Sequence, residues 1–257
     1  MMKKIILKVA EIISFFWHII PAKIRVTFIQ GLLILESRGN TINGIKQLFL
    51  IKDNLNLVIN ERALKYGNGI HPKHKLTKYH DFFTDNILNG ENILDIGCGY
   101  GAVARTVALK KNKSKVVGID YDDNKLLQAN NKNQLKNLQF FKLDATKKLP
   151  EGKWDVIILS NVLEHINKRV LFLKKIIKNS NFKKLLIRVP CFERSWEVPM
   201  RKVLKINYFS DDDHKIEHTL QQFIDEMKNS GLKIIEIKII WGEIWAICKI
   251  NKNYGKS

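Results

Sequence analysis

The stretch ILDIGCGYG, residues 93–101, constrains the fold of this chain more than any other part of its sequence. A short apolar run leads into three closely spaced glycines, and helix-forming residues follow from Ala102. Glycines in such a turn let the backbone approach a ligand closely, and the N-terminus of the following helix favours an anionic group. In an open α/β sheet, ligands bind beyond the carboxyl ends of the central strands. We therefore expect a ligand site at this turn.

Short β-rich runs alternate with helical stretches from residue 92 onward. The expected strands are residues 92–97, 115–120, 138–144, 154–160 and 183–189. The expected helices between them are residues 102–111, 123–135 and 168–179. This alternation predicts βαβ units, and therefore an α/β fold with a parallel sheet and helices on both of its faces.

The C-terminal part of the chain departs from this pattern. A helix is expected over residues 218–231, because Thr219 is a suitable N-cap and Gln222 stands three residues further on. Two strands are expected at residues 232–240 and 243–250. The link between them is too short for a crossover connection, so they should pair antiparallel. The sequence thus predicts a parallel sheet that ends in an antiparallel hairpin.

Asp95 decides which ligand suits the glycine turn. Its negative charge would repel a diphosphate but would attract a ligand that carries an ammonium and a sulfonium. S-adenosylmethionine (SAM) has both cations, and its carboxylate suits the helix N-terminus. A nicotinamide cofactor is disfavoured by Asp95 and also by the GxGxG spacing, which differs from GxGxxG. Cys98, inside the turn, is interpreted as a small residue beside the ligand.

Three more expected strands end in polar residues that suit SAM. Asp120 is placed to accept hydrogen bonds from both ribose hydroxyls, and Asp144 to accept one from the adenine amino group. Asn161 follows the next strand and is expected near the methionine end. Tyr121 and Ala145 directly follow the two aspartates and are counted with the cofactor-binding residues. Each residue alone fits a helix cap or a solvated turn, but their succession favours SAM.

Four motifs carry a resemblance to a known family: ILDIGCGYG, VVGIDYD, KLDATKKLP and WDVIILSNVLEHI. Over residues 65–250 the chain resembles the class I SAM-dependent methyltransferases, especially the methyltransferase type 11 group. The resemblance implies a Rossmann-like sheet of seven strands, mostly parallel, with an antiparallel last strand. It also implies a set of cofactor contacts, namely Asp95, Gly97, Gly99, Gly101, Asp120 and Asp144.

The segment SNVLEHI leaves the fourth expected strand on the ligand side. If its second half is helical, Asn161, Glu164 and His165 share one face. His165 is then the candidate general base for a hydroxyl acceptor, and Glu164 would orient it or bind substrate. The structural alternative is that Glu164 and His165 only hold a turn through hydrogen bonds.

A divalent metal is a further hypothesis for the same residues. VLEH and the later DDDHKIEHT are similar to motifs of the small-RNA 3′-terminal 2′-O-methyltransferases, in which two glutamates and two histidines hold a metal. By this resemblance Glu164, His165 and His214 match three of the four ligands. Asn161 stands where the first glutamate would be, which weakens a magnesium site. A metal-free site is therefore favoured.

Residues 190–217 form a long insertion before the last helix, and insertions of this length are usually lids or substrate loops. The segment HPKHKLTKYH, residues 71–80, is expected to cap the cofactor pocket from the other side. Together with RVP, Trp196 and the closing WGEIWA, these segments loosely resemble bacterial cell-surface polysaccharide methyltransferases. That resemblance implies a glycan or glycolipid acceptor.

Residues 1–85 are expected to be a helical N-terminal extension or cap, and residues 86–257 the SAM-binding methyltransferase domain. Within residues 1–25, apolar side chains recur at helical spacing opposite Lys and Glu. This helix either covers part of the protein's own core, which we favour, or rests on an anionic membrane face.

The net charge of +19 suits a polyanionic partner, but Lys is abundant throughout, so a compositional bias is the preferred explanation. Three widely separated cysteines indicate a reducing cytoplasm rather than a disulfide framework or a zinc site. The leading hypothesis is a SAM-dependent O-methyltransferase that acts on a surface-glycan or lipid-linked sugar. The alternatives are a metal-assisted RNA 2′-O-methyltransferase and a non-catalytic SAM-binding, membrane-associated scaffold.

Overall fold

The computed structural model describes residues 13–69 and 71–253 of the chain. The chain divides into two compact units, residues 1–71 and 72–257. The sequence placed a boundary at 85/86, whereas in the structure α4 (Lys73–Thr77) and α5 (Tyr79–Asp85) belong to the second unit. Residues 1–12 of the segment 1–25, in which an N-terminal helix is expected, lie outside the described residues, and the packing of that helix on the core stays a prediction.

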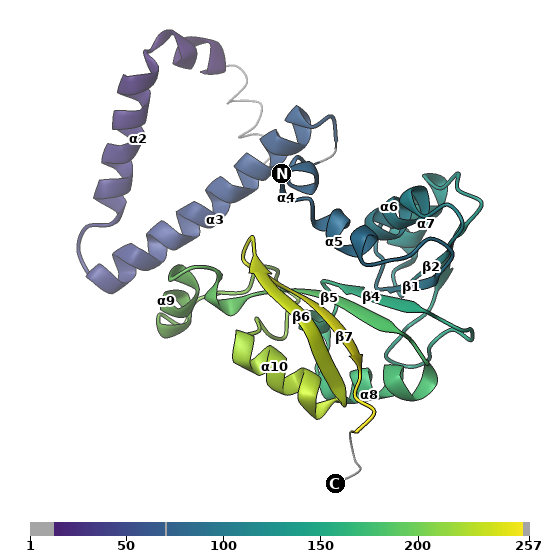
Figure 1. Cartoon of the computed structure of the whole chain (residues 1–257). Helices are drawn as coiled ribbons and strands as arrows, with labels where there is room; N and C mark the ends of the chain where they lie inside the picture. The colour runs from purple at the N-terminus through teal and green to yellow at the C-terminus, as the bar shows by residue number, and fades with distance from the viewer. Residues whose placement is uncertain (1–12, 70, 254–257) are drawn as a thin grey trace. The chain divides into compact units, whose positions relative to one another are not determined.

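The first unit is helical in its described part (Figure 1). A short helical stretch, residues 13–19, precedes α2 (Ala22–Glu36), and Asn40 caps α3 (Thr41–Tyr66) by accepting a hydrogen bond from the backbone of Asn43. α2 has no buried residue, and α3 buries only Gly44 and Phe49. The two helices therefore form no hydrophobic core of their own.

The second unit is built on a seven-stranded sheet with the order β3-β2-β1-β4-β5-β7-β6. Its strands are β1 (Asn92–Ile96), β2 (Lys115–Asp120), β3 (Leu138–Lys142), β4 (Val156–Ser160), β5 (Lys184–Pro190), β6 (Leu232–Ile240) and β7 (Glu243–Ile250). β1 to β5 pair parallel, and β7 pairs antiparallel with both β5 and β6. The predicted fold class is confirmed, and β3 ends two residues before the expected Asp144.

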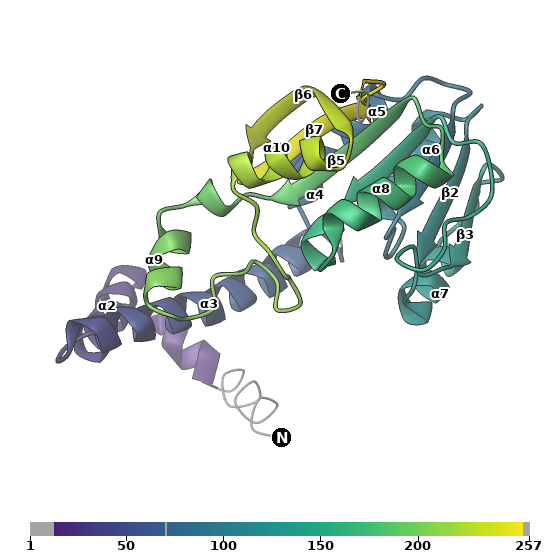
Figure 2. The ribbon, with the colours of Figure 1, turned by 90° about the horizontal axis from the view of Figure 1, so that it is seen from below.

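Helices cover both faces of the sheet (Figure 2). On one face α5, α6 (Ala102–Lys110) and α7 (Asp123–Asn131) contribute to a hydrophobic cluster that includes Phe83, Val107 and Leu126. On the other face α8 (Arg169–Asn179) and α10 (Leu220–Asn229) contribute Leu173 and Phe223 to a second cluster. Successive residues of a strand point to opposite faces, and β1 accordingly sends Ile93 to the α6 side and Leu94 to the α8 side.

Local sequence signals account for the C-terminal elements. Thr219 and Gln222 form the expected capping box at the start of α10. The β6–β7 turn places Trp241 and Gly242 at positive φ, 55° and 75°, as a tight two-residue hairpin requires. The insertion of residues 190–217 contains a short 3₁₀ turn, Phe192–Arg194, and α9 (Glu197–Val203).

Candidate active site

A cavity of about 500 Å³ lies beyond the carboxyl ends of β1, β2 and β4. It is lined by Ile96, Gly97, Gly99, Asp120, Tyr121, Lys125, Leu143, Asp144, Ala145, Thr146, Asn161, Val162, His165, Ile166, Phe172, Asp213 and Lys215. This is the position at which an open α/β sheet binds ligands. Eight of the residues singled out in the sequence therefore meet around one space.

The glycine turn is shaped by three different constraints. Gly97, Gly99 and Gly101 all have positive φ, between 53° and 71°. A Cβ at Gly97 would lie 2.7 Å from Val162, and one at Gly101 would lie 2.3 Å from the ring of Phe140. A Cβ at Gly99 would meet nothing within 4 Å. Because Gly99 lines the cavity, that open space is where a ligand would contact the backbone.

Asp95 lies beneath this turn rather than in the cavity wall. Its side chain is 2% exposed, and its Oδ2 has no hydrogen-bond partner among the described residues. Burial raises the pKa of Asp95 to about 7, and the nearby Asp120 acts in the same direction, while a backbone N–H of Ala104 opposes them. A buried carboxylate with an unused oxygen is what the ammonium group of SAM would satisfy.

Asp120 organises the turn as well as facing the cavity. Its Oδ2 accepts a hydrogen bond from the Gly99 N–H at 2.8 Å, and its Oδ1 accepts one from the Asp122 N–H at 2.9 Å. A carboxylate has about four acceptor positions, so two remain for ribose hydroxyls. Both the predicted role and a structural role are therefore compatible with its geometry.

Asp144 lies in a polar turn after β3. It accepts hydrogen bonds from the Thr146 hydroxyl at 2.6 Å and from the Thr146 backbone at 3.0 Å. The hydroxyl hydrogen bond holds the pKa of Asp144 below its ordinary value, so the group is ionised at neutral pH. Ala145 and Leu143 flank it in the cavity wall and supply apolar surface for an adenine ring.

Asn161 follows β4 in a strained conformation. Its φ is 55°, and its Oδ1 is buried with no hydrogen-bond partner among the described residues. Backbone in the left-handed region is uncommon for a residue with a side chain and often marks a functional position. Asp95 Oδ2 and Asn161 Oδ1 are thus buried polar atoms that a ligand can engage, and Gly99 leaves open space for that ligand. The residues present therefore fit SAM.

His165 lines the cavity close to the end of the insertion. Its Nδ1 lies 3.1 Å from Asp213 Oδ2, and its ring packs edge-on against that of His214 at 4.7 Å. Burial lowers the pKa of His165, although Asp213 acts in the opposite direction. The imidazole is therefore neutral at pH 7 and able to accept a proton.

Glu164 does not orient His165 as one sequence interpretation supposed. Its side chain is fully buried, and neither carboxylate oxygen has a hydrogen-bond partner among the described residues. Burial raises the pKa of Glu164 to about 8. The carboxylate beside the imidazole is that of Asp213, at the end of the insertion, which the sequence reasoning missed; it lies within ion-pair distance of Nδ1 without the alignment of a hydrogen bond. Its signal was the acidic run DDDH.

Glu164, His165 and His214 each offer a ligand atom, and these atoms lie within 4.8 Å of one another. Oxygen and imidazole nitrogen ligands suit several divalent metals. His214 is already engaged, because its Nδ1 lies 3.0 Å from Glu217 Oε1. Glu217 in turn accepts a hydrogen bond from Arg194 at 2.6 Å. The donor set thus fits a metal in composition, and the Glu164 carboxylate is the ligand for which the described part of the chain offers no hydrogen-bond partner.

The predicted site residues fall into two groups. Those that line the cavity are Gly97, Gly99, Asp120, Tyr121, Asp144, Ala145, Asn161 and His165. Those that lie behind its wall are Asp95, Cys98, Gly101, Glu164 and His214. Cys98 packs in the α6 cluster, where burial raises its pKa, so it supports the turn from behind.

The histidines of the 71–80 segment do not line the cavity in the described part of the chain. His74 contacts the Tyr79 hydroxyl at 2.6 Å, and His80 contacts the Thr106 hydroxyl at 2.7 Å. The insertion instead contributes Asp213 and Lys215 to the cavity wall. The backbone N–H of Lys215 donates to the Glu164 carbonyl at 2.7 Å, which fixes this end of the insertion.

Comparison with known proteins agrees with this geometry. The family model described as "Methyltransferase domain" matches residues 87–244. The ribosomal protein L11 methyltransferase of Neisseria gonorrhoeae is 35% identical over 103 residues, which are 39% of this chain and 32% of that protein. The chain thus spans about a third of the length of this curated relative.

Two solved structures share the fold. The small RNA methyltransferase HEN1 superposes with a TM-score of 0.56 at 17% identity, over 70% of this chain and 25% of that one. The magnesium protoporphyrin IX methyltransferase of Synechocystis PCC 6803, solved with bound SAH, gives a TM-score of 0.52 at 16% identity, over 68% and 80%.

Proposed function

We propose that this chain, which belongs to the methyltransferase domain family and is a SAM-dependent methyltransferase, methylates a hydroxyl group of a surface-glycan or lipid-linked sugar. The observation that carries the proposal is the position of His165 in the cavity wall, 3.1 Å from Asp213, where burial lowers the pKa of its imidazole. A hydroxyl must lose its proton during transfer, whereas an amine acceptor does not need a base in the same way. Membership of this family favours an enzyme over the non-catalytic scaffold.

The chemistry needs alignment and one proton acceptor. SAM supplies a methyl group that is already activated by its sulfonium. Asp120 and Asn161 in the cavity wall, and Asp95 behind the glycine turn, would orient the cofactor, and the apolar residues Val162 and Phe172 would keep water from its surroundings. As the acceptor oxygen bonds to the methyl carbon and the carbon–sulfur bond breaks to leave S-adenosylhomocysteine, His165 would take the hydroxyl proton and Asp213 would stabilise the resulting imidazolium.

Support for a sugar acceptor comes from the insertion. It contributes Asp213 and Lys215 to the cavity, and both are suited to sugar hydroxyls. Trp196, in the same insertion, is 69% exposed and offers a face on which a sugar ring can stack. We place the reaction in the cytoplasm, where the three free cysteines would stay reduced.

The test uses purified protein, methyl-labelled SAM and separate fractions of host glycans, lipid-linked sugars and RNA. We expect label in a sugar ether. In His165→Ala, kcat should fall about 100-fold or more, while SAH affinity stays within threefold. His71→Ala, outside the cavity lining, is the control and should keep full turnover. Label in protein or amine, or full activity of His165→Ala, would contradict the proposal.

A second candidate is a metal-assisted RNA 2′-O-methyltransferase. The buried, unpartnered Glu164 beside His165 and His214 favours it, as does the net charge of +19. In this case turnover on RNA would be lost with EDTA and restored by Mg²⁺ or Mn²⁺, and RNA binding would weaken steeply with salt. Activity on sugars that is unchanged by EDTA would dismiss this candidate.

A further inference from the structure

The N-terminal unit leaves an unusual amount of apolar surface uncovered. Over residues 13–69 it contains many exposed large apolar side chains, among them Phe16, Phe28, Leu32, Leu35 and Leu57. Its longer helices bury only Gly44 and Phe49. Soluble proteins rarely expose apolar patches beyond a few hundred Å² unless the patch meets a protein or a membrane. Something outside this unit must therefore cover it.

The distribution of apolar side chains around α2 indicates what kind of surroundings bury them. Exposed apolar residues of α2 are Ile24, Val26, Phe28, Ile29, Leu32, Ile34 and Leu35. At about 100° per residue, these positions surround the helix instead of forming one stripe. A helix that docks on another protein needs a stripe, whereas a helix that is apolar all round suits hydrocarbon.

The uncharged segment of α2 is too short to cross a bilayer. Residues 26–35 carry no charge and lie between Arg25 and Glu36. At about 1.5 Å per residue they extend about 15 Å, which is half of a hydrocarbon core of about 30 Å. Among the described residues no single helix is long and apolar enough to cross a membrane. Residues Ile13–Ile19 and Ala22–Glu36, bent by 110°, pass that test only as a pair.

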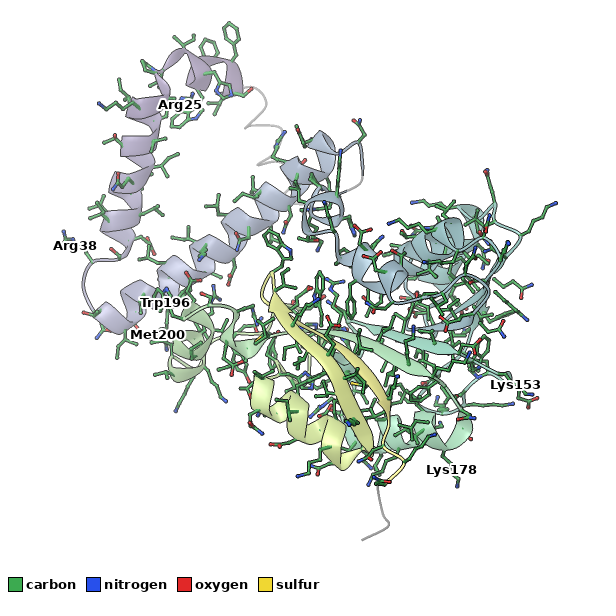
Figure 3. The ribbon with its side chains drawn as sticks, in the orientation of Figure 1. Arg25, Arg38, Lys153, Lys178, Trp196 and Met200 are labelled. Atoms are coloured by element: carbon green, nitrogen blue, oxygen red, sulfur yellow. The ribbon has the colours of Figure 1, made fainter. Side chains whose placement is uncertain are left out.

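Charges and aromatic rings flank this segment as they would at a lipid headgroup layer. Residues 13–69 contain seven Lys and Arg against three Asp and Glu. Arg25 and Arg38 lie near the two ends of α2 (Figure 3). The Trp17 ring lies edge-on to Phe28 at 6.5 Å, and Trp is enriched at membrane interfaces. Basic residues of this kind attract anionic headgroups.

We infer that the N-terminal unit is a membrane anchor confined to one leaflet, in which residues 13–19 and α2 lie along an anionic bilayer, with Arg25 and Arg38 at the headgroups and the apolar side chains of residues 26–35 in the hydrocarbon. This inference does not depend on the acceptor. It places the enzyme where lipid-linked substrates occur, and it would hold equally for another acceptor.

The test is flotation of the full chain with vesicles of phosphatidylglycerol and phosphatidylcholine, and with vesicles of phosphatidylcholine alone. We expect strong binding to the anionic vesicles and at least tenfold weaker binding to the neutral ones. Phe28→Glu/Leu32→Glu should lower binding to anionic vesicles at least tenfold. Leu109→Glu/Leu127→Glu makes the same charge change at exposed leucines of α6 and α7 and should change binding less than threefold. SAH binding verifies the fold of each variant.

A second measurement does not depend on these charge changes. Brominated lipids should quench the fluorescence of the wild-type protein more than that of Trp17→Phe. Failure of the wild type to bind anionic vesicles would overturn the inference, as would equal losses in both double variants. So would a dimer in solution that Phe28→Glu/Leu32→Glu converts to a monomer without any vesicle binding, because the cover would then be a second copy of the chain.

Discussion

At the scale of single residues, the site depends on polar groups that are buried before their ligand arrives. Asp95 and Asn161 each keep an oxygen without a partner among the described residues. Such atoms cost free energy in the free enzyme and regain it when a ligand supplies the hydrogen bond. The free protein is therefore poised for a ligand with an ammonium group.

The pKa of Asp95 predicts how cofactor binding depends on pH. With a pKa of about 7 in the free protein, Asp95 is ionised above pH 7, and only then does it attract the ammonium of SAH. We expect SAH to bind about tenfold more weakly at pH 6 than at pH 8. Calorimetry across this range measures the slope. Asp95→Asn should bind weakly at every pH, and a wild-type affinity that is flat from pH 6 to 8 would contradict the assignment.

The same pKa predicts an effect on stability. Because burial raises the folded-state pKa of Asp95 from 3.8 to about 7, its contribution to stability is fully present below about pH 4, falls as pH rises from about 4 to 7, and is lost above pH 7. Without ligand, Asp95→Asn should therefore be more stable than wild type to urea denaturation at pH 8, by up to about 4 kcal/mol. The two proteins should differ little near pH 4. Equal stability at pH 8 would show that Asp95 is not desolvated.

Most residues of the site can be predicted from the residue types at strand ends, but Asp213, the neighbour of His165, cannot. Strand ends after β2, β3 and β4 pointed to Asp120, Asp144 and Asn161 because parallel strands share one edge. Asp213 lies far along the chain, in a loop without periodicity. Its position beside His165 depends on the Lys215 hydrogen bond to the Glu164 carbonyl, a tertiary contact that no local pattern encodes.

At the scale of elements, the glycine turn between β1 and α6 combines packing with binding. Gly101 faces Phe140 of β3, whereas Gly99 faces open space at the cavity. The two glycines share positive φ but differ in what a side chain would meet. Alanine substitutions at these two glycines can therefore be compared to separate an effect on folding stability from an effect on ligand affinity.

Gly101→Ala should lose more stability than Gly99→Ala. Both pay about 1–2 kcal/mol for the left-handed backbone, and only Gly101→Ala adds overpacking of about 1–3 kcal/mol against Phe140. SAH affinity should fall in Gly99→Ala, at least tenfold, because its methyl group enters the cavity. Urea denaturation and calorimetry measure the two effects. Equal stability of the variants would contradict the packing argument.

Elements with strong local signals were predicted accurately. The capping box of α10 and the two-residue turn between β6 and β7 are encoded within a few residues. Boundaries were less accurate where a strand continues into a polar turn. The strand ending at Asp144 was expected to include that residue, but Asp144 instead accepts hydrogen bonds from Thr146 and leaves the ladder.

At the scale of the whole molecule, both hydrophobic clusters consist of residues from 79 onward. The second unit therefore contains its own core. A chain of residues 72–257 should fold and bind SAH within threefold of the full chain. Circular dichroism and calorimetry measure this, and the shortened chain should lose vesicle binding. Aggregation together with loss of SAH binding would show that the N-terminal unit is needed for folding.

The hydrogen bond from Lys215 to the Glu164 carbonyl has a consequence for how this enzyme could diversify. It attaches the C-terminal end of the insertion to the loop after β4. The part of the cavity expected to bind the methyl donor is formed by the turns after β1 and β2. Residues 195–209 lie upstream of that attachment point. They could be exchanged or lengthened in descendants of this protein, altering which molecule is methylated, while methyl-donor recognition is inherited unchanged.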